Sequence, residues 1–169
     1  MSAQIKPVDV ELDALQLRRV MGCFATGVTV VTTMSCDDSP LGLVVNSFSS
    51  VSLSPPLIQW NIKLDSPSRA AFRSYSSFAV NIMGAEDKEQ TLRFANPKVD
   101  KFSGVDWSPG KTGVPILSNA AAILECELCK SLICGDHEIL IGKVVSMRQS
   151  DLAPLLFHRG KFMSIGDEL

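Results

Sequence analysis

The sequence predicts a mainly β fold, a β-barrel with helices at its periphery. Short runs rich in Val, Ile, Thr and Phe recur along the chain and are separated by turn residues. Few segments have the apolar spacing of a helix. The regular alternation of strand and helix that builds a doubly wound parallel sheet is missing. A length of 169 residues fits one domain, which we expect over residues 1–169 with its core at about 13–165.

The first element is predicted to be an amphipathic helix over residues 13–24. Its apolar side chains recur at the i, i+3, i+4, i+7 spacing of one helix face: Leu17, Val20, Met21 and Phe24. Gly27 follows as the stop signal.

Strands make up most of the remaining elements. A Val- and Thr-rich strand is expected at 28–34, with a turn at 36–40 and a return strand at 41–47. Further strands are expected at 57–63, 78–83, 121–133, 138–147, 154–157 and 161–165. The turn at 134–136 indicates a long hairpin, and the last two strands are expected to close the sheet.

Two short helices interrupt the strands, at 66–74 and 86–94. Ser66 suits the N-cap of the first, and Pro67 suits its first helical position. The segment 96–113 mixes Pro, Gly, Lys and Asp and is interpreted as a long loop on the same domain.

Composition and charge exclude several classes of protein. With 46% hydrophobic residues, the chain is not disordered, and 16 basic against 18 acidic residues do not favour nucleic-acid binding. The polar N-terminus indicates no signal peptide, and no apolar run is long enough to span a membrane. Five cysteines, an odd number, favour free thiols in a reducing cytoplasm.

The strongest local pattern is a window rich in serine. Half of the 20 serines lie in the 31 residues from Ser47 to Ser77. The segment 46–52 lies at the end of a strand and is rich in hydroxyl and amide side chains. Its backbone N–H groups need hydrogen-bond acceptors. Such a window is either a solvated loop or a surface for a flat polar ligand. Ser66 and Ser68 would add a phosphate site at a helix start, with Lys63 and Arg69 nearby.

A second pattern, C-x2-C-x4-C-x2-H, leaves two interpretations open. Cys126, Cys129, Cys134 and His137 have a spacing that could bind structural zinc. Residues three apart on a strand point to opposite faces, however, which favours free thiols. His137 itself either caps a turn or binds a ligand, with Asp136 placed to orient its ring.

Two stretches taken together resemble the flavin reductase-like family, the short NAD(P)H:flavin oxidoreductases of two-component monooxygenases. They are R-V-M-G-C-F-A-T-G-V-T-V-V-T at 19–32 and N-S-F-S-S-V-S-L-S-P-P at 46–56. G-D-H at 135–137 and L-L-F-H-R-G-K-F at 155–162 follow in the family's order. The resemblance covers about residues 13–165. Phe162 stands where tyrosine is common in the family.

The resemblance implies a fold and a set of site residues. The fold is an FMN-binding split β-barrel of Greek-key type, usually a homodimer. The flavin ring and ribityl chain would contact Asn46, Ser47, Phe48, Ser49 and Ser50. The phosphate would lie at Lys63, Ser66, Pro67 and Ser68, and the flavin would also be lined by Phe94, Ala95 and Lys101. His137 would bind the nicotinamide nucleotide, and no residue is expected to bind a metal.

The same resemblance implies NAD(P)H-dependent reduction of FMN or FAD. Hydride would pass from nicotinamide to flavin without a protein acid or base, so the protein would contribute positioning and preorganised donors. Reduced flavin would then reach a separate oxygenase. A flavin-binding storage or sensor module and a zinc-stabilised interaction domain are the alternatives. The sequence does not choose between FMN and FAD or between NADH and NADPH.

Overall fold

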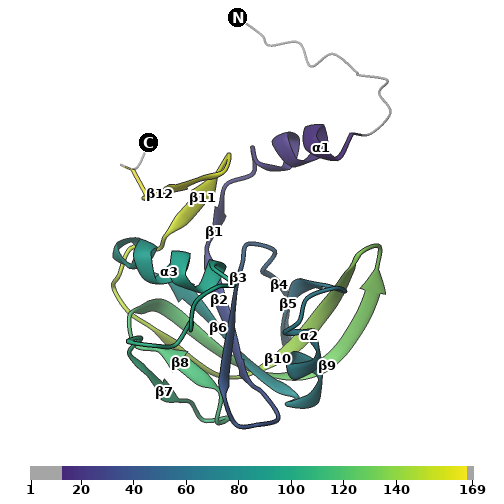
Figure 1. Cartoon of the computed structure of the whole chain (residues 1–169), viewed down its shortest axis with the longest axis vertical. Coiled ribbons are helices and arrows are strands. Elements are labelled where there is room, and N and C mark those ends of the chain that lie inside the picture. The colour runs from purple at the N-terminus through teal and green to yellow at the C-terminus, as the bar shows by residue number, and fades with distance from the viewer. Residues whose placement is uncertain (1–12, 167–169) are drawn as a thin grey trace, which may run out of the picture.

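A seven-stranded antiparallel sheet forms the centre of the structure (Figure 1). The computed structural model describes residues 13–166. The strand order is β3-β2-β6-β9-β10-β5-β4. The strands are β2 (Thr29–Met34), β3 (Pro40–Val45), β4 (Ser49–Leu53), β5 (Pro56–Lys63), β6 (Ser77–Met83), β9 (Ala120–Cys134) and β10 (His137–Gln149). The last two form the predicted long hairpin, which projects from the sheet in Figure 1.

The sheet is a split barrel because its two edges come from neighbouring parts of the chain. β3 and β4 are the edge strands, although only residues 46–48 separate them in sequence. The chain therefore crosses from one edge to the other within three residues, which brings the edges together without pairing them. The predicted mainly β barrel is confirmed, and the split lies between β3 and the β4–β5 pair.

Aromatic side chains fill the barrel. Trp60 on β5 is fully buried. The centroid of its ring lies 4.8 Å from that of Phe72 and 5.8 Å from that of Phe78, and both pairs are edge to face. Such pairs add about 0.5–1.5 kcal/mol each beyond the area that they bury. Ile58 and Ile62 flank Trp60 on the same face of β5, as the period of two in a strand requires.

The helices lie at the periphery, as predicted. They are α1 (Ala14–Met21), α2 (Arg69–Ser74), the 3-10 turn η1 (Ala85–Asp87) and α3 (Lys88–Ala95). α2 contributes Phe72 to the barrel core, and α3 contributes Phe94 to a second cluster with Met83 and Leu117. α1 buries none of its residues and stands away from the barrel (Figure 1).

Two predicted helix ends are wrong. The first helix ends at Met21, because the N–H groups of Cys23 and Phe24 donate to carbonyls three residues back instead of four, at Val20 and Met21. α2 begins at Arg69, with Ser68 rather than Ser66 at its N-cap. Ser66 instead lies in a turn, where its N–H donates to Lys63 and its carbonyl accepts from Arg69.

The last two strands do not close the main sheet, which corrects a third prediction. β11 (Leu156–His158) pairs with β12 (Lys161–Met163) and with β1 (Thr26–Gly27) in a separate three-stranded sheet. The reason is that Leu155 donates to Met83 and accepts from Val28, which directs the chain toward β1.

The expected loop at 96–113 is irregular for most of its length but contains one strand. β7 (Trp107–Pro109) pairs with β8 (Pro115–Leu117). Within residues 13–166 no helix is long and apolar enough to cross a membrane. The segment on which the expectation of no signal peptide rests lies almost wholly outside these residues.

Candidate functional site

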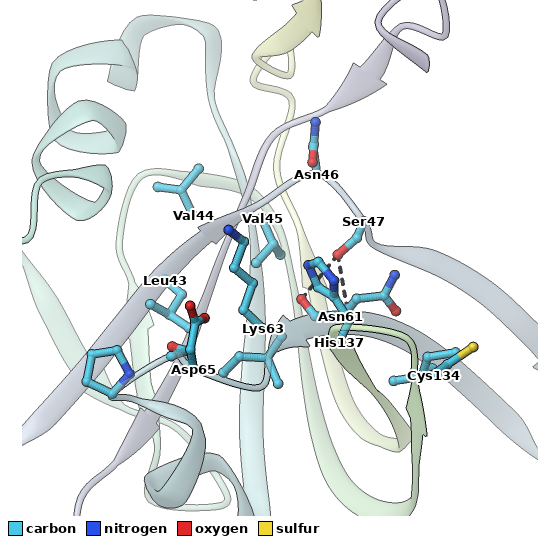
Figure 2. A pocket seen from close by; sticks show the side chains of 14 residues that line it. Leu43, Val44, Val45, Asn46, Ser47, Asn61, Lys63, Asp65, Cys134 and His137 are labelled. Atoms are coloured by element: carbon cyan, nitrogen blue, oxygen red, sulfur yellow. Dashed lines mark hydrogen bonds between the residues drawn. The ribbon is translucent and has the colours of Figure 1, made fainter. Parts of the chain in front are cut away.

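A cleft of about 800 Å³ lies at the split of the barrel (Figure 2). Three segments line it: residues 43–47 at the end of β3, residues 61–63 and 65–67 at and after the end of β5, and residues at the β9–β10 turn. Clefts of about 300–1,000 Å³ hold most small ligands and cofactors. The cleft brings together six residues predicted for the site: Asn46, Ser47, Lys63, Ser66, Pro67 and His137.

Strand alternation determines which side chains reach the cleft. β5 and β10 pair antiparallel, with Lys63 opposite His137 and Asn61 opposite Ile139. All four line the cleft. The glutamate between His137 and Ile139, Glu138, is buried on the opposite face. The lysine and the histidine, 74 positions apart in sequence, are therefore cross-strand neighbours.

The segment 46–48 presents backbone donors beside the cleft. None of its three N–H groups donates to another of the described residues. The Ser47 hydroxyl accepts from the backbone N–H of Asn61 at 3.0 Å and lies 3.4 Å from the Asn61 carbonyl oxygen. It thus fastens the segment to β5 across the split, which leaves the amides to meet a ligand.

His137 and Asp136 interact at the rim of the cleft. The Nδ1 atom of His137 lies 2.7 Å from Oδ1 of Asp136, and the imidazole is 37% exposed. The hydrogen bond from His137, together with its charge, lowers the pKa of the Asp136 carboxyl. The predicted contact between these two side chains is confirmed. A carboxylate in this position fixes the orientation of the ring.

One polar group of the cleft went unnoticed in the sequence. Asn61 lines the cleft, and its Oδ1 atom is buried with no hydrogen-bond partner among the described residues. A buried amide oxygen without a partner is costly and indicates a missing donor. The spacing in the sequence is enough to place Asn61 at the site, because it lies two residues before Lys63 and so shares the same face of the strand.

Four of the other predicted residues lie near the split but outside the cleft lining. Phe48 packs against the barrel core. Ser49 accepts a hydrogen bond from Gln59 on the neighbouring strand at 3.1 Å. Ser50 is exposed on β4, and Ser68 caps α2 with its backbone only.

The remaining three predicted residues belong to α3 and the loop after it. Phe94 is buried and packs so closely on Gly42 that a Cβ at Gly42 would lie 2.6 Å from its ring. Ala95 is exposed at the end of α3. The Lys101 ammonium donates to the Gly42 carbonyl at 3.0 Å, and burial lowers its pKa. Phe94 and Lys101 therefore contact β3 at Gly42, and neither lines the cleft.

The cysteines have different surroundings. Burial raises the pKa of the Cys126 thiol to about 12, so it stays protonated at neutral pH, whereas a zinc ligand must be a thiolate. Cys129 is exposed, and its thiol donates to the Ile141 carbonyl. Within residues 13–166 no group of three or more His, Cys, Asp or Glu side chains is placed to hold a metal ion.

Comparison with known proteins identifies the family. The model of the flavin reductase like domain matches residues 21–166. The chain belongs to this family. A probable flavin reductase of Rhizobium meliloti is 40% identical over 152 residues, which are 90% of this chain and 49% of that protein. The chain thus spans about half the length of this relative.

Two further members of the family match over most of their length. The reductase subunit HsaB of a flavin-dependent monooxygenase from Mycobacterium tuberculosis is 36% identical, covering 95% of this chain and 87% of the subunit. The structure of an NADH:FAD oxidoreductase from Streptomyces globisporus in complex with NAD and FAD fragments has a TM-score of 0.88 and 37% identity. That match covers 96% of this chain and 98% of the other. The split barrel is therefore the fold of flavin reductases.

Proposed function

We propose that this flavin reductase-like protein transfers reducing equivalents from NADH or NADPH to FMN or FAD and releases reduced flavin to a separate oxygenase. One observation carries the proposal. Around one volume lie Asn46 and Ser47 with free backbone donors, Lys63 and Ser66 with a cation and a hydroxyl, and the His137 ring. Family membership and the names of the relatives support the same activity.

The residues of the cleft match the parts of a flavin. Leu43, Val45 and Ile139 offer apolar surface for a planar ring. The amides of 46–48 offer donors to the ring carbonyls and nitrogens, and the unpartnered Oδ1 of Asn61 needs a donor such as a ring N–H. Lys63 and the Ser66 hydroxyl suit a phosphate. We assign these residues to flavin binding.

Positioning is the protein's contribution to the reaction. The bound flavin supplies the hydride-accepting chemistry. The donors at 46–48 are held by the Ser47 bridge, so they need no rearrangement to stabilise negative charge on the ring. His137, fixed by Asp136 and facing Lys63 across the strands, would hold the nicotinamide nucleotide against the flavin.

The protein would act as a homodimer with one flavin reductase-like domain per chain. What supports a dimer is the exposed apolar surface at the end of α1 and just after it: Val20, Met21 and Phe24 are 67%, 63% and 74% exposed. A second copy would cover such a patch.

The five cysteines, all free, support a reducing cytoplasm as the location.

NADH and NADPH oxidation at 340 nm with added FMN, FAD or riboflavin tests the proposal. We expect oxidation that depends on added flavin. Absence of oxidation with every pair would overturn the reductase function. A protein that binds flavin without turnover would instead be a storage or sensor module.

A further inference from the structure

A second hollow adjoins the cleft at Ser66 and Pro67. It is a groove of about 580 Å³ along α2. Leu64, Ala70 and two arginines, Arg69 and Arg73, complete most of its lining. Because Ser66 and Pro67 line both hollows, a ligand whose phosphate lies at Ser66 can continue directly from the cleft into the groove.

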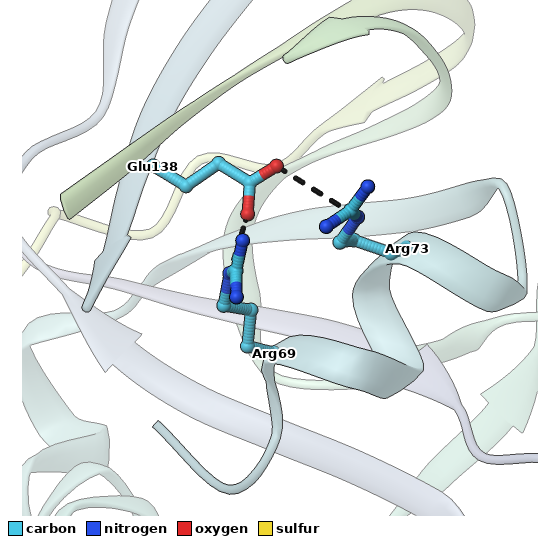
Figure 3. Close-up of polar contacts among 3 residues, drawn as sticks. All are labelled: Arg69, Arg73 and Glu138. Carbon is cyan, nitrogen blue, oxygen red and sulfur yellow. Dashed lines mark hydrogen bonds and ion pairs between the residues drawn. The ribbon is translucent and has the colours of Figure 1, made fainter. Parts of the chain in front are cut away.

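The groove contains more positive than negative charge. Arg69 and Arg73, both from α2, face one carboxylate, Glu138 of β10 (Figure 3). Arg69 donates to Glu138 at 2.5 Å, whereas the nearest nitrogen of Arg73 is 3.9 Å from the other carboxylate oxygen. The second distance is too long for a hydrogen bond. Glu138 therefore neutralises Arg69 and leaves Arg73 in surplus.

Arg73 is also free to bind a ligand. Its side chain is 55% exposed, and it donates no hydrogen bond to any residue of the described range 13–166. A guanidinium presents five donors in a planar fork that matches a phosphate. Arg73 lines the groove, and within the described residues none of its five donors is in use.

We propose that this groove binds the adenylate half of FAD, with Arg73 as the residue that selects FAD over FMN. The inference rests on the proposed function, because it starts from a flavin phosphate at Lys63 and Ser66. FMN ends at that phosphate. FAD continues through a second phosphate to adenosine, which would lie over Leu64 and Ala70, with Arg73 on the second phosphate.

Asp65 is the carboxylate that opposes this arrangement. It is exposed, and it lines the flavin cleft beside Ser66 rather than the groove. Its charge therefore acts on the first phosphate, which FMN and FAD share. The ratio of the two affinities thus depends on the arginines, and the ratio is what an experiment needs to measure.

The test is flavin affinity, measured by fluorescence quenching with FMN, FAD and riboflavin on the full chain. Arg73→Gln removes the charge and the guanidinium fork but keeps a polar side chain at the position. We expect Kd for FAD to rise about fivefold, the size of one partly exposed ion pair, with FMN and riboflavin unchanged. Lys88→Gln, which removes an exposed cation on α3, is the matched control and should change no affinity.

Three results would overturn the inference. Equal weakening of FMN and FAD would place Arg73 at the first phosphate. No change with FAD would show that the groove does not hold the second one. A raised KM for NADPH or NADH with unchanged FAD affinity would assign the groove to the nicotinamide nucleotide. If the native chain binds no flavin, the proposed function itself fails, which separates the two failures.

Discussion

The two faces of the β5–β10 strand pair have opposite characters. On the inner face, Trp60 and Leu140 are fully buried in the barrel core. On the outer face, Asn61 and His137 line an open cleft with unsatisfied or half-exposed polar groups. Trp60 and Asn61 are adjacent in sequence, as are His137 and Glu138.

One rigid pair of strands therefore serves both stability and binding. The aromatic core fixes the position of each strand, so the polar side chains between the core residues are fixed as well. A ligand site on such strands is preorganised without its own side chains having to pack. Changes on the two faces should therefore separate loss of folding from loss of binding.

The largest effect is expected for Trp60→Ala. Removing a fully buried indole leaves a cavity and should lower the free energy of unfolding by about 4 kcal/mol, measured by urea denaturation. Asn61→Ala, one position along, should cost less than about 1 kcal/mol and instead weaken flavin binding. Similar losses of stability in both variants would contradict the division between the faces.

Glu138→Gln tests whether the negative charge of this buried carboxylate stabilises the fold. Burial acts to raise the pKa of Glu138, but hydrogen bonds from Arg69 and Ser131 and the arginine charges together lower it. A lowered pKa contributes stability above the unfolded-state pKa, and that stability is lost as pH falls through the folded-state pKa.

We therefore expect the variant to be less stable by about 2 kcal/mol at pH 7. The difference from the native chain should shrink as pH falls below about 4.5. Thermal unfolding between pH 3.5 and 7 checks both points. A difference that stays constant over this range would mean that the charge of Glu138 does not matter.

His137→Ala should affect the nicotinamide nucleotide more than the flavin. We expect KM for NADH to rise about fivefold, the loss of one hydrogen-bonded contact, with little change in KM for flavin. Steady-state kinetics with each substrate varied in turn measure both values. Equal effects on both would make His137 a structural residue of the turn.

The smallest effect is expected for Ser66, at the proposed site of the flavin phosphate. Ser66→Ala should shift preference from FMN toward riboflavin about threefold, because one neutral donor is lost. Ser68→Ala is the matched control, since the Ser68 side chain makes no capping hydrogen bond and lies outside the cleft. An identical shift in both variants would indicate an effect on α2 and not on the phosphate.

Local patterns predicted the elements well and their assembly less well. The β-branched runs and the Gly135 turn identified the strands, because these signals depend on neighbouring residues only. The separate β1-β11-β12 sheet depends on contacts between residues more than a hundred positions apart, such as Thr26 with Phe157, which no local pattern encodes.

The same distinction holds for the site. Lys63 and His137 were found singly, but their cross-strand contact follows from the β5–β10 register, which the sequence did not reveal. The serine window proved to contain different environments. Ser47 bridges to β5 and Ser66 reaches the cleft, whereas Ser49 and Ser50 lie on β4. A count of hydroxyl groups does not distinguish a bridge from a ligand contact.

The alternation along β5 also limits how the length of this strand can change. Inserting or deleting one residue between Trp60 and Lys63 would exchange the two faces beyond that point. The lysine would then point into the apolar barrel. Changes of two residues would preserve the facing of every side chain. Among related chains, length differences within this strand should therefore come in pairs, and single insertions should be found only in the loops.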